Sequence, residues 1–175
     1  MVNYKLYKSD TVVNNKNQLI NTIKKTHSKI KNLFNAEETT WIYNKYNFFQ
    51  MSSTDLNCYH LFIELKKIIR EYAGHKRPLW FQCWVNFHTP DEVLDWHDHA
   101  WPFHGYICID AKKTKTVFED YEILNEDGNI YIGPGYKKHM VEVLQNYKNP
   151  RITLGFDVTE NNKDIFDMNS FFPID

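Results

Sequence analysis

The sequence lacks the features that mark membrane-embedded and disulfide-rich proteins. Its 175 residues include only three cysteines, without paired spacing, which favours free thiols in a reducing compartment over a disulfide framework. No apolar run approaches the roughly 18 residues that a membrane-spanning helix needs. The first residues, MVNYKLYKSD, show no signal-peptide pattern. We therefore expect a cytoplasmic protein without a membrane partner.

The sequence also lacks an excess of either charge, since its formal net charge is −1. Residues 1–76 carry 12 Lys and Arg against 6 Asp and Glu, whereas residues 77–175 carry 9 against 16. No basic cluster interleaved with aromatic residues occurs, which disfavours a nucleic-acid partner. We expect a small-molecule or peptide substrate, and the composition leaves the oligomeric state open.

The first part of the chain has helical periodicity. Apolar residues recur at helical spacing over residues 18–34 and again after residue 55. A residue of Ser52-Ser53-Thr54-Asp55 can cap the start of the second helix, and Gly74 can end it in a left-handed conformation. We expect residues 1–77 to form a helical support region packed outside a sheet.

From residue 78 the hydrophobic period changes to two, which is the period of a β-strand. Strands are expected over residues 79–87, 93–99, 105–110, 114–124, 129–132, 139–144 and 151–158. So many short strands with turns between them predict a jelly roll, or double-stranded β-helix, over residues 78–160. The expected fold is a single domain, mainly β, with bracing N-terminal α-helices. Residues 161–175 should form a tail packed by its phenylalanines.

Three histidines have the pattern of a metal site. His97 and His99 share one face of the expected strand, so both imidazoles can reach the same ion. His139 follows a Gly-Pro-Gly turn at residues 133–135 and is the best candidate for a third ligand. Imidazole suits iron, copper, nickel or zinc, so ligand type alone does not select the metal.

Arg151 lies at the start of an expected strand whose neighbours Ile152 and Leu154 are apolar. A guanidinium in such a place needs a planar anionic partner. That partner is either the carboxylate of a ligand or an internal Asp or Glu. Thr153 alternates onto the same face and can donate its hydroxyl to the same carboxylate.

Together these motifs resemble the core of the iron(II)/2-oxoglutarate-dependent oxygenases over about residues 80–158. The resemblance rests on WVNFHTPDEVLDWHDHAWPFHGYICID, GNIYIGPGYKKHMVEV and RITLGFDV. It is strongest to a small branch with His-x-His, a distal His and then Arg-x-Ser/Thr. It implies iron(II) on His97 and His139, with Arg151 and Thr153 on the far carboxylate of 2-oxoglutarate.

Two departures from the superfamily pattern bear on the site. Most members have His-x-Asp or His-x-Glu, but here the second position is His99. We expect His99 as the third ligand, and Asp98 and Asp95 stay open as alternatives. Asn86 and His88 stand where an Asn-x-Tyr contacts the cosubstrate in the nucleic-acid demethylase branch, so the resemblance extends a cofactor-binding role to them.

The reaction that this resemblance implies is hydroxylation of a substrate C–H bond, with succinate and carbon dioxide as co-products. Two other hypotheses are compatible with the same residues. One is a cupin-like metalloprotein that uses the three histidines without 2-oxoglutarate. The other is a non-catalytic jelly-roll binding module.

Overall fold

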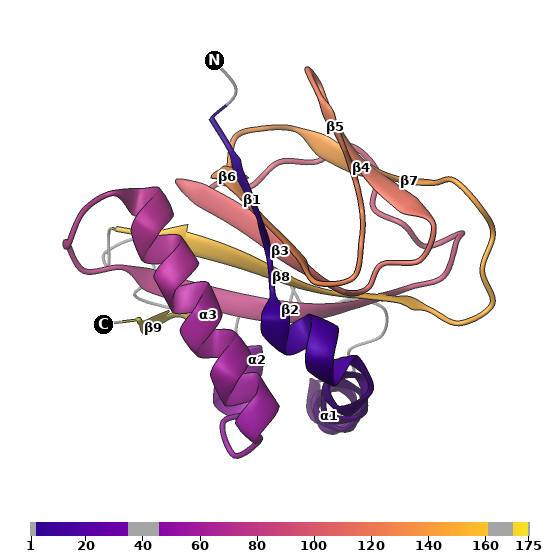
Figure 1. The fold of residues 1–175 in the computed structure, drawn as a ribbon, viewed down its shortest axis with the longest axis horizontal. Coiled ribbons are helices and arrows are strands. Elements are labelled where there is room, and N and C mark those ends of the chain that lie inside the picture. Colours follow the sequence, from indigo (N-terminus) through magenta and orange to yellow (C-terminus); the bar gives the residue numbers. More distant parts are fainter. Residues whose placement is uncertain (1–2, 35–45, 161–169, 175) are drawn as a thin grey trace.

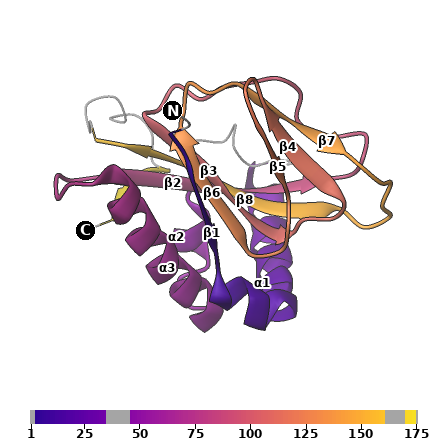
Figure 2. The ribbon, with the colours of Figure 1, turned by 45° about the horizontal axis from the view of Figure 1, so that its top comes forward.

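The computed structural model describes residues 3–34, 46–160 and 170–174. Two β-sheets lie one above the other, and the helices cover the outer face of the larger sheet (Figures 1 and 2). The larger sheet has the strand order β1 (Lys5–Lys8), β6 (Asn129–Pro134), β3 (Phe103–Asp110), β8 (Arg151–Thr159), β2 (Trp80–His88) and β9 (Phe172–Pro173). The smaller sheet has the order β5 (Glu122–Leu124), β4 (Thr114–Phe118) and β7 (His139–Val143).

Neighbouring strands are antiparallel throughout both sheets. The predicted fold class is confirmed: a mainly β, jelly-roll core braced by helices. None of the described helices is long and apolar enough to cross a membrane.

The helices are α1 (Asp10–Phe34), the single turn α2 (Phe48–Met51) and α3 (Leu56–Ala73). Their apolar faces form one buried cluster with the outer face of the larger sheet. At the start of α3, the Asp55 carboxylate accepts a hydrogen bond from the Cys58 amide at 3.0 Å. At its end, Gly74 has φ of 72°, as expected for a left-handed cap. Both predicted helix ends are confirmed.

Two predicted strands are wrong. Residues 93–99 do not form a strand, because this segment has only one bridge, His97 to His139. Residues 114–124 are not one strand but the hairpin of β4 and β5, which turns where Tyr121 O accepts from Phe118 N. In the expected tail, Phe172 pairs with β2, whereas Phe166 lies outside the described residues.

The two faces of the larger sheet carry different kinds of residue. On β8, Ile152, Leu154 and their alternate neighbours face the helices, in the main buried cluster. The intervening residues face the smaller sheet. Gly155 has to be small there, since a Cβ at this position would lie 2.5 Å from the Trp84 ring. The sheet thus presents polar residues of β2 and β8 to the space between the two sheets.

We predict that the Asp55→Ala variant lowers the free energy of unfolding by about 1 kcal/mol, because α3 loses its N-terminal cap. The substitution also removes the 2.7 Å hydrogen bond from Thr22 Oγ1 that ties α1 to α3. Urea denaturation followed by circular dichroism measures the change. Ser53→Ala, at an exposed position two residues earlier, is the matched control. Equal stability of the two variants would contradict the assignment of the cap.

Candidate metal centre

An irregular segment brings two of the predicted ligands to the third. His97 N donates to His139 O at 3.0 Å, and His139 N donates to His97 O at 2.9 Å. On either side, Val141 N donates to Leu94 O at 3.0 Å and His99 N to Gly135 O at 2.9 Å. The segment therefore runs alongside β7 as an extended edge, although it is not a regular strand.

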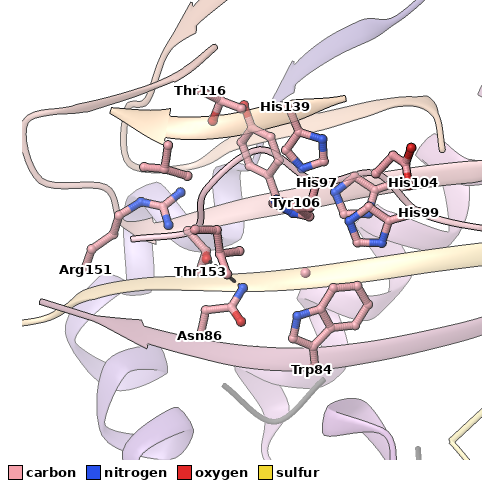
Figure 3. Close-up of a pocket in the computed structure, with 14 residues that line it drawn as sticks. Trp84, Asn86, His97, His99, His104, Tyr106, Thr116, His139, Arg151 and Thr153 are labelled. Atoms are coloured by element: carbon pink, nitrogen blue, oxygen red, sulfur yellow. Dashed lines mark hydrogen bonds between the residues drawn. The ribbon is translucent and has the colours of Figure 1, made fainter. Parts of the chain in front are cut away.

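The three imidazoles converge as the sequence predicted (Figure 3). One candidate ligand atom from each of His97, His99 and His139 lies within 4.8 Å of the others. The ring centroids of His97 and His139 are 4.3 Å apart, and those of His97 and His99 are 5.4 Å apart. The geometry is compatible with a shared ion, whereas the role of these residues as ligands stays a prediction.

The Nδ1 atom of each imidazole has an oxygen beside it. His97 Nδ1 lies 2.6 Å from Asp95 O, and His139 Nδ1 lies 3.0 Å from Lys137 O. A carbonyl oxygen can only accept, so these two Nδ1 atoms carry the proton and donate it. His99 Nδ1 lies 3.0 Å from the carboxylate of Asp157. Hydrogen bonding thus leaves Nε2 as the ligand atom of His97 and His139, the pattern expected of metal-bound histidine.

Burial keeps the imidazoles of His97 and His139 neutral. It lowers the pKa of His139 to about 2, and it also lowers the pKa of His97 below its ordinary value. A metal binds the neutral form of imidazole, so no proton has to leave before an ion enters at neutral pH. The residues present therefore fit a divalent transition metal.

Both alternative ligands, Asp98 and Asp95, are exposed to solvent. Asp98 lines the cavity but is exposed, and Asp95 is exposed with its carboxylate on the amide of Trp96 at 2.8 Å. Among the described residues, neither groups with His97 and His139 as a possible ligand set.

A carboxylate that the sequence analysis missed lies behind the histidines. Asp157 is fully buried, and its Oδ1 is 3.0 Å from Nδ1 of both His99 and His104. Burial alone would raise the pKa of Asp157, but the hydrogen bond from His104 and the close approach of the His99 ring outweigh it and hold that pKa well below its ordinary value. The signal was in the sequence, because Asp157 shares the Arg151 and Thr153 face in a period-two strand.

A cavity of about 220 Å³ lies in front of the histidines. Arg151 points into it from the end opposite to them (Figure 3). This side chain is 3% exposed, and within the described residues it has neither an ion pair nor a hydrogen bond; its Nε is buried without a partner. An internal Asp or Glu partner, the alternative raised by the sequence, is thus absent from the described part of the chain.

Of the other predicted cofactor-binding residues, two line the cavity and one does not. Thr153 and Asn86 both line the cavity, and Asn86 Nδ2 donates to Thr153 Oγ1 at 3.3 Å. His88 is buried opposite Arg151 in the pairing of β2 with β8, but it is not part of the cavity lining. Burial, and then the positive charge of Arg151, lowers the pKa of His88 to about 4.

Comparison with known proteins shows that this chain shares its fold with solved structures. No family model matches the sequence, and no curated protein matches it. Among solved structures, the non-heme alpha-ketoglutarate-dependent carbocyclase SnoK from nogalamycin biosynthesis is 10% identical, with a TM-score of 0.57 over 90% of this chain and 80% of its own. This similarity establishes a shared fold.

Two further structures are similar over smaller parts of the chain. An oxidoreductase of the 2OG-Fe(II) oxygenase family from Burkholderia pseudomallei is 14% identical, with a TM-score of 0.48 over 64% of this chain. The chain spans only 59% of the length of that protein. A cupin-2 domain containing protein from Shewanella frigidimarina is 15% identical, with a TM-score of 0.35 over 54% of this chain and 97% of its own.

We predict that the apoprotein loses stability as the pH falls from about 7 to about 5. His88 and His104 have a pKa of about 4 in the folded chain, whereas the ordinary value is 6.5. At a pH between these two values, each histidine takes up a proton when the chain unfolds. Stability therefore rises with pH across this window, by up to about 1.4 kcal/mol per pH unit for each such histidine. Urea denaturation at the two pH values measures the loss.

His88→Gln should reduce this pH dependence, whereas His60→Gln, at an exposed histidine, should leave it unchanged. Stability that is the same at both pH values would contradict the prediction.

Proposed function

We propose that the protein is an iron(II)- and 2-oxoglutarate-dependent dioxygenase that hydroxylates a C–H bond of its substrate. The observation that carries this proposal is the buried Arg151 guanidinium, which has no partner in the described chain and faces a cavity that ends at three histidines. A buried charge without a partner costs several kcal/mol, so it is retained where a ligand pairs with it. The similarity of fold to SnoK is compatible with this assignment.

His97, His99 and His139 would hold the iron. The oxygen atoms beside each Nδ1 support a preformed ligand set. When bound, iron(II) would supply the activation of dioxygen that no amino-acid side chain can provide.

Arg151 and Thr153 would hold 2-oxoglutarate at the far end of the cavity. A guanidinium binds a carboxylate through two parallel hydrogen bonds, which orients the cosubstrate as well as binding it. Asn86 would act through Thr153, because its amide donates to the threonine oxygen and so leaves the hydroxyl proton to point at a ligand.

The remaining cavity wall favours a small organic substrate or a peptide side chain. It consists largely of uncharged aromatic and aliphatic groups, among them Trp84, Leu94, Tyr106 and Val141. Such walls exclude water from the site. Arg151 is the one permanently charged cation among the lining residues, so the wall offers little to a nucleic-acid backbone.

We predict that Arg151→Met weakens 2-oxoglutarate binding by about 2 kcal/mol or more, because the cosubstrate carboxylate then lacks its buried partner. That loss corresponds to roughly a 30-fold rise in the dissociation constant. Anaerobic titration of the iron-loaded protein, followed by the visible charge-transfer band of the iron–2-oxoglutarate complex, measures it. Metal binding itself should remain within about threefold of the wild type.

The matched control is Arg77→Met, at an arginine whose side chain is 68% exposed. This control should bind 2-oxoglutarate like the wild type. An iron-loaded wild type that shows no band and forms no succinate would contradict the proposal. Metal-dependent activity that is indifferent to both 2-oxoglutarate and Arg151→Met would favour the cupin-like alternative.

We also predict that His139→Ala and His97→Ala each lower the affinity for Co(II), used as an air-stable probe, by at least about 100-fold, because each removes one of three ligands. His75→Ala is the control, since this histidine pairs with Glu160 away from the cavity. Competition against a fluorescent chelator measures the dissociation constants. Binding of Co(II) by both variants with wild-type affinity would contradict the three-histidine site.

A further inference from the structure

The three-histidine set has a deficit of negative charge. A divalent ion held by two histidines and one carboxylate keeps one net positive charge, whereas an ion held by three neutral imidazoles keeps both. A preformed site for a dication is stronger when an anion lies near it, since Coulomb interactions are large in a buried environment. The carboxylate that lines the cavity, Asp98, is exposed to solvent, and so is that of Asp95.

Asp157 lies close enough to His99 to act on the metal indirectly. Its Oδ1 lies 3.0 Å from Nδ1 of His99, the residue that stands in place of the usual carboxylate. Within the described chain it meets no Lys or Arg, so its charge is not neutralised by a cation of the protein. A fully buried carboxylate in that position is costly unless something positive compensates for it.

From this geometry we propose that Asp157, acting through His99, replaces the carboxylate that most related sites place directly on the metal. The contact would orient the His99 ring with Nε2 toward the ion and would add one negative charge behind it. Asp157 is thus a positioning residue rather than a ligand. The inference rests on the metal site of the proposed function, but not on the use of 2-oxoglutarate.

A polar chain fixes the orientation of Asp157. Ser170 Oγ donates to Gln82 Oε1 at 2.9 Å, which assigns the other amide atom, Nε2, as the donor toward Asp157 Oδ2 at 3.0 Å. Oδ2 is therefore engaged, and Oδ1 is the oxygen that remains for the histidines. Asn47 holds Ser170 in turn, because its Nδ2 donates to the Ser170 carbonyl at 3.1 Å.

His104 holds the plane of the His99 ring. The two rings stack with centroids 3.5 Å apart and an interplanar angle of 13°. His104 Nδ1 donates to the same Oδ1 of Asp157 at 3.0 Å. The His99 ring is thus bounded by a stacked neighbour and a buried carboxylate, which leaves its orientation little freedom.

The same residues suggest a competing arrangement. Candidate ligand atoms of His99, His104 and Asp157 lie within 4.8 Å of one another, so Asp157 could instead be a direct ligand of a second ion. The two arrangements differ in metal stoichiometry and in which nitrogen of His99 binds metal. Both differences can be measured.

The first experiment compares Co(II) affinity in a double-mutant cycle. Asp157→Asn should raise the dissociation constant by about 10- to 100-fold, the usual effect of losing an outer-shell partner. His99→Asp places a carboxylate directly on the ion, so in that background Asp157→Asn should change the affinity by less than about threefold. This background dependence separates the proposed role from simple destabilisation.

A second experiment needs no variant at the carboxylate and applies even where Asp157→Asn fails to fold. In the Zn(II)-loaded wild type with ¹⁵N-labelled histidine, the proposal expects His99 to carry a proton on Nδ1 and the metal on Nε2. A metal on Nδ1 of His99, or two bound ions per chain, would overturn the proposal in favour of direct ligation.

Other outcomes are equally decisive. An Asp157→Asn variant that is folded and binds Co(II) like the wild type overturns this inference and leaves the proposed function intact. A wild type that binds one Co(II) but never 2-oxoglutarate overturns the proposed function and leaves this inference intact.

Discussion

The site depends on the pair of backbone hydrogen bonds between His97 and His139. These two residues are far apart in the chain, and their side chains meet because the peptide groups beside them are paired. Paired backbone groups satisfy their own hydrogen-bonding needs without any side chain. The imidazoles are therefore left to face the cavity, and a third ring, His99, follows two residues later on the same extended segment.

The second constraint is the alternation of β8. One face of this strand supplies the main buried cluster under the helices, and the other supplies Arg151, Thr153 and Asp157 to the space between the sheets. A single strand thus contributes to stability with every second residue and to the site with the others. The strand also spans the site, since the Arg151 guanidinium lies at its start and the buried Asp157 carboxylate lies near its end.

This separation of charge has a physical consequence for ligand binding. The guanidinium faces the part of the cavity where a diacid would be bound, while the carboxylate lies behind the imidazoles where a cation would be bound. Each buried charge is thus on the side where it attracts the ligand of opposite sign. Neither charge has a strong partner of opposite sign in the described protein, which favours a site that is completed by its ligands.

Sequence alone determined the features that follow local rules. Periodicity located most strands, and the capping residues Asp55 and Gly74 were predicted because a helix end has the same chemistry in any fold. The histidines and Arg151 were predicted as site residues because few other residue types provide their chemistry. The two strand errors also have a local cause: a period of two describes an extended segment equally well whether or not it finds a regular partner.

Only the tertiary structure decided how these residues combine. The convergence of His97 and His139, the absence of a described partner for Arg151, and the place of Asp157 behind His99 all depend on which strands pair and in what register. Alternation along β8 puts Asp157 on the same face as Arg151, but it does not say which residue of another strand lies opposite. Contacts between residues distant in sequence are set by packing, and a pattern read along one chain does not contain them.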